Sequence, residues 1–364
     1  MKILGIETSC DETSAAVVDD ELRVHSNIIQ SQIDLHERYG GIVPELASRR
    51  HIVAILPTIE LALEEAQTTL DKIGAIAVTE GPGLAGSLLV GVNVAKALSW
   101  SRDLPLIPVN HLEGHIYANW LRPADDPEWS PPEFPVVCLI VSGGHTELLL
   151  MREHGTYELL GQTIDDAAGE AFDKGARILG LGFPGGPAIQ KAAANGRTGQ
   201  HPLPRAWLGE SYDFSFSGLK TALLREAEQY RRPRGGRTRA SESDPFQTHE
   251  PVQYGPNVPI ADIAADYQDA IVEVLVNKTA RAARDYRAAT VLLAGGVAPN
   301  ALLRKRLQAA VSVPLRYPPV ILCTDNAAMI AGAAHFNTRR GDRAALDLDI
   351  HPRLPLTTKT AIKS

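Results

Sequence analysis

Two histidines four residues apart, His111 and His115, have the spacing in this sequence that most directly suggests chemistry. On an α-helix at about 100° per residue they lie about 40° apart, so both imidazoles project from one face and could share a metal ion. Glu113, between them, would lie about 200° round from His111. A zinc protease places its glutamate directly after the first histidine, where it acts as general base. The spacing therefore disfavours a protease. The pair alone leaves a metal site and ordinary helix histidines both open.

Two glycine-rich turns could bind an anion: "SGGH" at 142–145 and "AGGVAPN" at 294–300. Glycine tolerates positive φ and lets backbone N–H groups approach an oxyanion closely, so each turn could hold a phosphate or an acyl phosphate. A plain tight turn is the alternative for each. Neither is a P-loop, because Gly-Lys-Ser/Thr is absent, and neither has the three spaced glycines of a dinucleotide site.

The elements that must position these residues alternate between strands and helices. Residues 2–9 and 15–20 read as a hairpin with an acidic, hydroxylated tip, and 136–151 repeats that design around "SGGH". A buried strand within 289–300 stops at Gly-Gly, and an amphipathic helix follows. This order is the layout of the actin-like ATPase (ribonuclease H-like) fold. We therefore predict an α/β protein of two related domains with a nucleotide- and metal-binding cleft between them.

Composition excludes several other classes. The 364 residues, 44% of them apolar, are enough for two domains with a core each. No stretch of about 18 apolar residues predicts a membrane span, and three widely spaced cysteines fit a reduced cytoplasmic protein. A formal net charge of -7 argues against a surface that coats nucleic acid throughout. Any RNA contact must use a local patch.

Seven segments resemble, in order and over roughly residues 1–352, the tRNA N6-adenosine threonylcarbamoyltransferase family. They are "GIETSCDETSAAVV", "HLEGHIYANW", "LIVSGGHTEL", "DDAAGEAFDKGARILGLGFPGGP", "FSFSGLKTALL", "GGVAPN" and "CTDNAAMIAGAA". The resemblance implies transfer of a threonylcarbamoyl group from threonylcarbamoyl-AMP to N6 of the adenosine at position 37, next to the anticodon, of tRNAs that read codons beginning with A. AMP is released. A small-molecule kinase of the same fold and a non-catalytic scaffold are the alternatives.

The resemblance also implies site residues. One divalent metal per subunit, Fe(II) or alternatively Zn(II), would bind His111, His115 and Asp325. The pocket for the adenylate would contain Val141, Ser142, Gly143, Gly144, His145, Asp173, Gly186 and Asn300. Asp173 could instead be a helix-surface aspartate, and Asn300 a helix cap. One of Asp11 and Glu12, at the first hairpin tip, is the candidate for accepting the proton or for orienting the amine, with solvated turn carboxylates as the alternative. Gln190 stands where many relatives carry an acidic residue.

The resemblance implies tRNA and threonylcarbamoyl-AMP as substrates, an actin-like non-catalytic paralogue subunit and a small ATPase as partners, no membrane, and a cytoplasmic location. We expect an N-terminal domain at 1–134, completed by about 325–352, and a C-terminal domain at 135–324. Within it, 231–257 carries five arginines in nine residues and should form a flexible insert. That insert is either a local contact for tRNA phosphates or a tolerated insertion. Residues 353–364 should form a disordered tail.

Overall fold

Two five-stranded sheets form the frame of the computed structural model, which describes residues 1–122, 129–231 and 252–356. The first sheet has the order β3-β2-β1-β4-β5, and the second has the order β10-β9-β6-β7-β8. The strands of the first sheet are β1 (Lys2–Glu7), β2 (Glu12–Asp19), β3 (Val24–Ser31), β4 (Ile73–Gly81) and β5 (Leu106–Asn110). Those of the second are β6 (Val136–Val141), β7 (Thr146–Glu153), β8 (Thr156–Gln162), β9 (Thr290–Ala294) and β10 (Leu315–Arg316).

The two hairpins predicted from the sequence occupy equivalent places in these sheets. β1 pairs antiparallel with β2 as far as Glu7 opposite Ser14, and β6 pairs with β7 as far as Val141 opposite Thr146. In each sheet the first strand of the hairpin is the central strand, and it also pairs in parallel with β4 or β9 on its other side. The mixed α/β architecture with two related halves is therefore confirmed.

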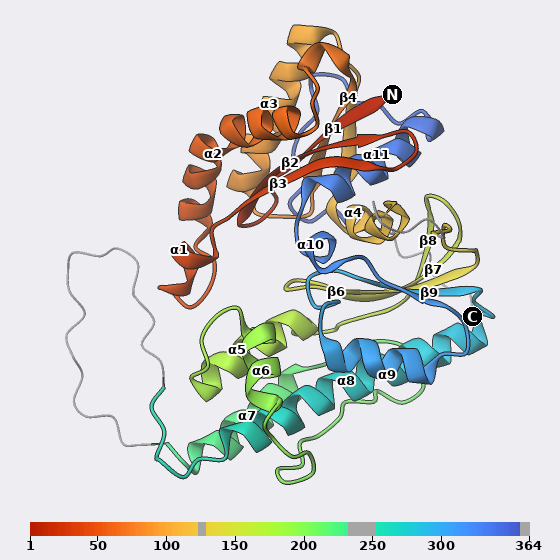
Figure 1. Ribbon diagram of the computed structural model, residues 1–364. Coiled ribbons are helices and arrows are strands. Elements are labelled where there is room, and N and C mark those ends of the chain that lie inside the picture. Colours follow the sequence, from red (N-terminus) through yellow and green to blue (C-terminus); the bar gives the residue numbers. More distant parts are fainter. Residues whose placement is uncertain (123–128, 232–251, 357–364) are drawn as a thin grey trace, which may run out of the picture.

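Helices cover both sheets and fill the space between them (Figure 1). The outer face of the first sheet carries α2 (Pro44–Glu65) and α3 (Ala85–Arg102). The outer face of the second carries α5 (Ala168–Leu179), α6 (Gly185–Ala193), α7 (Ser217–Glu228), α8 (Ile260–Asp285) and α9 (Ala301–Ala310). Between the sheets lie α4 (His111–Tyr117) and α11 (Ala327–Arg340). The short helices α1 (Ile33–Glu37) and α10 (Val320–Cys323) lie at the opening between the halves.

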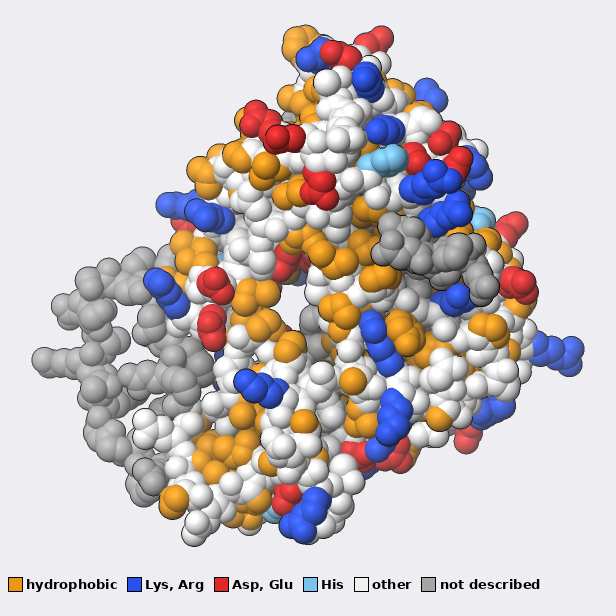
Figure 2. Space-filling view, in the orientation of Figure 1, with side chains coloured by type: hydrophobic (Ala, Val, Ile, Leu, Met, Phe, Trp, Pro, Cys, Tyr) orange, Lys and Arg blue, Asp and Glu red, His pale blue; other side chains and the backbone are white. Residues whose placement is uncertain are grey.

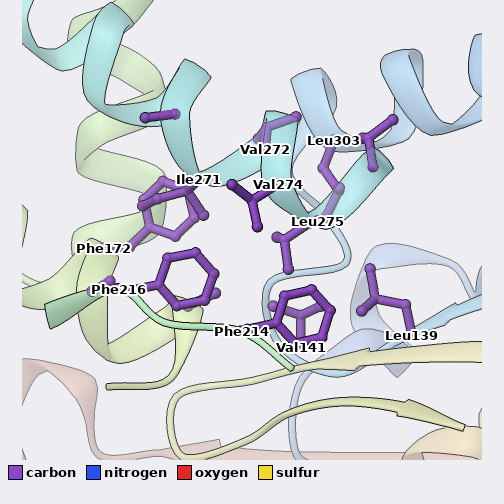
Figure 3. Close-up of a cluster of buried hydrophobic side chains, with 14 of the residues drawn as sticks. Leu139, Val141, Phe172, Phe214, Phe216, Ile271, Val272, Val274, Leu275 and Leu303 are labelled. Atoms are coloured by element: carbon purple, nitrogen blue, oxygen red, sulfur yellow. The ribbon is translucent and has the colours of Figure 1, made fainter. Parts of the chain in front are cut away.

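Alternation of side chains along the strands produces three cores. On β6, Leu139 and Val141 pack outward beneath Phe214 and the helices that cover the second sheet (Figure 3), whereas Cys138 and Ile140 face inward. The inward side chains of both sheets and the buried side chains of α4 and α11 belong to one apolar cluster. The helix that carries the histidine pair is therefore held inside the shared core of the two halves.

Two predicted mobile segments lie partly outside the described residues. Of the predicted insert at 231–257, residues 232–251 are not described, but Tyr254 is partly buried and its hydroxyl donates to Ile178 O. Residues 357–364 of the predicted tail are likewise not described, whereas Leu356 packs against the core between the sheets. The ends of both segments thus make contacts that their polar composition did not predict. None of the helices in the described ranges is both long and apolar enough to cross a membrane.

Candidate metal centre and ligand cleft

A cleft of about 290 Å³ opens where the two hairpin tips face each other. Figure 2 shows the hollow in the middle of this face, between the upper and the lower half of the molecule. Asp11 and Glu12 line it from the first hairpin, Ser142 and Gly143 from the second, and Asp325 from the segment before α11. Residues that are more than 300 positions apart in the sequence, such as Asp11 and Asp325, therefore line one cavity.

Helix ends fix the three predicted metal ligands. β5 ends at Asn110, whose side chain accepts a hydrogen bond from Leu112 N at 2.9 Å, so α4 begins at His111. Asp325 directly precedes Asn326, which caps α11 by accepting from Met329 N at 3.0 Å. The result brings one ligand atom from each of His111, His115 and Asp325 within 4.8 Å of one another.

The donor set fits a metal ion. Asp325 Oδ1 lies 3.2 Å from His115 Nε2 and 3.5 Å from His111 Nε2. His115 is 1% exposed, and neither of its ring nitrogens has a hydrogen-bond partner among the described residues; the approach of Asp325 is too poorly aligned to count as one. A buried imidazole without partners is costly. A cation bound by two imidazoles and a carboxylate would remove that cost, so the group could hold a metal.

Two carboxylates favour positive charge on His111. Burial alone would raise the pKa of Asp325, but the charge of His111 and the close approach of His115 lower it to about 2. Burial would lower the pKa of His111, yet Asp325 and Glu7 raise it to about 9. Burial and the charges of His111 and His115 lower the pKa of His145 to about 4, which places its imidazole within the field of the same group.

Glu7, Ser9 and Thr79 lie beside His111, outside the ligand group, and the sequence reasoning missed them. Glu7 is fully buried at the end of β1, where its Oε2 lies 3.1 Å from His111 Nδ1. Thr79 Oγ1 donates to the same oxygen at 2.6 Å, and Ser9 Oγ lies 3.1 Å from the same ring nitrogen. The available signal was an acidic residue inside the apolar strand "KILGIE", because a buried charge needs partners.

Gly5 allows Asp325 to reach the centre. A Cβ atom at Gly5 would collide with Ala327 O and would also press on Ala331 in the first turns of α11. Because Gly5 has no side chain, α11 can begin directly against β1. This contact fixes Asp325, which lies two positions before the helix.

The predicted adenylate residues lie at different depths. Ser142, Gly143, Asp173, Gly186 and Asn300 line the cleft. Val141, Gly144 and His145 are not among its lining residues. Val141 is fully buried, and its carbonyl accepts from Val297 N at 2.9 Å, which joins the two glycine-rich turns.

Two of these polar side chains also hold the protein together. Asp173 Oδ1 accepts from Gly185 N at 2.7 Å and so anchors the start of α6. Asn300 caps α9 by accepting from Leu303 N at 3.0 Å, and it donates to Gln268 Oε1 at 3.1 Å. Asn300 is therefore a helix cap, as the alternative predicted, and it also lines the cleft.

Gln190 also lines the cleft, at the position where many relatives carry an acid. Its Oε1 accepts from Ala301 N at 2.7 Å, so it ties α6 to the first residue of α9. A carboxylate oxygen could accept the same bond. The departure from the family pattern therefore leaves this contact intact.

Glu113 points away from the histidine pair, as the helix geometry predicted. Its carboxylate accepts from Tyr157 Oη at 2.7 Å, Asn337 Nδ2 at 3.1 Å and Arg340 Nη2 at 3.2 Å. It therefore ties α4 to β8 and α11. Glu113 therefore does not lie where a general base beside the metal would have to lie.

We expect Glu113→Gln to lower the free energy of unfolding by about 2 kcal/mol while metal content stays at the wild-type level, because hydrogen bonds to a charged group contribute about 1.5–3 kcal/mol. Urea unfolding and metal analysis of the purified variant measure both. A variant of wild-type stability that had lost its activity would contradict this structural role.

The comparisons with known proteins agree with each other. The family model described as tRNA N6-adenosine threonylcarbamoyltransferase matches residues 23–332. Proteins of that name are 68% identical in Thermomicrobium roseum, over 100% of this chain and 99% of that one, and 49% identical in Bacillus subtilis, over 98% and 96%.

Solved structures with low identity share the fold. HypF in its phosphate- and nucleotide-bound form aligns with a TM-score of 0.56 at 14% identity, over 93% of this chain and 46% of that one. Component A of the Acidaminococcus fermentans (R)-2-hydroxyglutaryl-CoA dehydratase aligns with a TM-score of 0.51 at 14% identity, over 93% and 98%. The fold is thus the predicted actin-like one.

Proposed function

The chain belongs to the tRNA N6-adenosine threonylcarbamoyltransferase family, and we propose that its cleft transfers the threonylcarbamoyl group of threonylcarbamoyl-AMP to N6 of the adenosine next to the anticodon, in tRNAs that read codons beginning with A. One observation carries the proposal: Asp325 of the buried His-His-Asp group lines the same cleft as Gly143 and Gly186. The kinase and scaffold alternatives gain no support from the relatives.

The proposed step is acyl transfer from a mixed anhydride. The N6 amine of the adenine attacks the carbamoyl carbonyl carbon, so a C–N bond forms while the C–O bond to the phosphate breaks. The amine loses one proton to an acceptor, and AMP leaves with the bonding electron pair. The protein must hold the anhydride, stabilise the developing negative charge and receive that proton.

Backbone and side chains of the second half would hold the donor. Gly143 and Gly186 border the cleft, and an added Cβ at either would meet no atom within 4 Å, so this space is open to a ligand. Asp173 and Asn300 can offer polar atoms to ribose hydroxyls or to an adenine edge. The "SGGH" turn can direct backbone N–H groups at the phosphate.

Side chains at the tip of the first hairpin would accept the proton that the N6 amine loses. Asp11 and Glu12 both line the cleft opposite the "SGGH" turn. Burial and the charges of Asp11 and Asp325 raise the pKa of Glu12 to about 10, which favours its protonated form. We therefore assign the role of proton acceptor to Asp11, and that of hydrogen-bond donor to Glu12.

His111, His115 and Asp325 would bind one divalent metal, which we propose to be Fe(II), with Zn(II) as the alternative. When bound, such an ion acts as a Lewis acid toward carboxylate, hydroxyl or phosphate oxygens of the donor. Mixing the protein with unmodified tRNA, threonylcarbamoyl-AMP and its pathway partners, followed by nucleoside mass spectrometry, tests the function. Absence of threonylcarbamoyladenosine would count against it.

We propose that the actin-like paralogue subunit docks on the outer helices of the first sheet, and that the small ATPase joins that complex in the cytoplasm. Large apolar side chains are exposed on α2 at Ile52, Val53 and Leu56, and on α3 at Leu89 and Trp100. In Figure 2, orange side chains gather over this part of the upper half. Exposed apolar patches of this kind mark protein interfaces.

Leu56→Asp should weaken association with that paralogue at least about tenfold, because a charge would be buried where an apolar side chain was. Leu56 is 56% exposed, so the isolated chain should fold and bind metal normally. Analytical ultracentrifugation of the mixture measures the association. The matched control is Leu224→Asp on α7, which is 40% exposed on the other half. Equal effects of the two variants would refute the assignment of this face.

A further inference from the structure

We propose that Glu7 is a positioning residue of the metal centre: its carboxylate accepts the Nδ1 proton of His111 and so directs Nε2 of that ring to the metal. The inference rests on the metal site of the proposed function. It concerns the order and rigidity of that site before any substrate binds.

The carboxylate of Glu7 is fixed on both oxygens. Oε2 accepts from Thr79 Oγ1 at 2.6 Å and lies 3.1 Å from His111 Nδ1, and Oε1 accepts from Ser9 N. The side chain is 0% exposed at the end of β1. A buried carboxylate with three partners has one orientation available, and that orientation meets the imidazole edge.

This contact determines which nitrogen of His111 is free. With the Nδ1 proton bound by a carboxylate, Nε2 is the nitrogen left to bind a metal, and it lies 3.5 Å from Asp325 Oδ1. A carboxylate on the far side of a ligating imidazole fixes its tautomer and ring orientation and raises its basicity. His111 is therefore oriented before the metal binds.

The other histidine has no such support. Neither ring nitrogen of His115 has a hydrogen-bond partner among the described residues, although the two rings lie 4.6 Å apart, centroid to centroid. The two ligands are thus unequal. The protein orients His111 through Glu7, whereas a bound ion would be the first polar partner of the His115 ring among the described residues.

Ser9 is the competing partner, because its Oγ also lies 3.1 Å from His111 Nδ1. A hydroxyl could accept the same proton. It would leave the imidazole less basic than a carboxylate does. Variants of Glu7 and Ser9 therefore show whether metal affinity depends on the carboxylate or on any polar group that contacts Nδ1 of His111.

The test is metal affinity of the full chain, measured with Zn(II) and Co(II) against a chromophoric chelator. Glu7→Gln should weaken binding about 10–100-fold, the usual effect of losing such a partner, and should shift the Co(II) absorption bands. Ser9→Ala should stay within about twofold of the wild type, by the same reasoning. Equal effects of the two, or an affinity of Glu7→Gln within about twofold of the wild type, would overturn the inference.

NMR of the zinc-loaded wild type gives a second readout that needs no stable variant. The Nδ1 proton of His111 should appear as a far-downfield, slowly exchanging resonance that Ser9→Ala retains. Its absence from the wild type would overturn the role of Glu7. A wild type that bound no Zn(II), Co(II) or Fe(II) would instead remove the metal site itself, and with it the role of Glu7. Loss of tRNA modification alone, with metal binding as expected, would bear only on the proposed function.

Discussion

His115→Ala is expected to lose stoichiometric metal and to reduce tRNA modification by about a hundredfold or more, while the protein still folds. A Lewis acid contributes several kcal/mol to stabilising charge in a transition state, and about 1.4 kcal/mol corresponds to a tenfold change in rate. His115 offers one of the three ligand atoms that lie within 4.8 Å of one another. With only two ligands left, the site should bind metal weakly.

Metal analysis after purification without chelator, together with initial rates of modification, measures this prediction. The matched control is His335→Ala, which removes another buried histidine, from α11, outside the cleft. That variant should keep its metal. Wild-type rates in metal-free His115→Ala would show that the His-His-Asp group has no role in the transfer.

Gly143→Val is expected to weaken binding of a non-hydrolysable threonylcarbamoyl-AMP analogue about 10–100-fold without changing the fold. Gly143 lines the cleft, and an added Cβ would meet no atom of the protein within 4 Å. The new side chain would occupy the space of the ligand, and overfilling a packed site costs about 1–3 kcal/mol. Metal content should not change, because the metal ligands belong to other segments.

Calorimetric titration of the analogue measures the loss, and thermal unfolding checks the fold. Gly186→Val should behave in the same way, because Gly186 also faces open space in the cleft. Gly218→Val on α7 is the control, since Gly218 faces open space away from the cleft. Unchanged affinity in both cleft variants would show that the adenylate binds elsewhere.

Local sequence patterns predicted the two hairpins and indicated two of the three candidate metal ligands. The two hairpins followed from apolar runs around polar tips, and the direction of Glu113 away from the histidine pair followed from the helical angle alone. His111 and His115 are close because they are one turn apart, which any helix guarantees. The family resemblance, and no local pattern, supplied Asp325 and the adenylate residues.

The rest depends on tertiary packing that a single sequence does not state. Asp325 reaches the histidines because Gly5 admits α11 against β1, and nothing near "CTDNAA" indicates that contact. Glu7 could be recognised as a buried acid, but its partner His111 lies 104 residues away. The contact of Tyr254 with Ile178 O was missed because one aromatic side chain in a polar segment gives no periodic signal.

The most direct measurement is nucleoside mass spectrometry of unmodified tRNA after incubation with threonylcarbamoyl-AMP, the pathway partners and either the wild type or His115→Ala. We predict threonylcarbamoyladenosine, at the adenosine next to the anticodon, only with the metal-loaded wild type. Equal amounts with both proteins, or none with the loaded wild type, would contradict a metal-dependent transfer in this cleft.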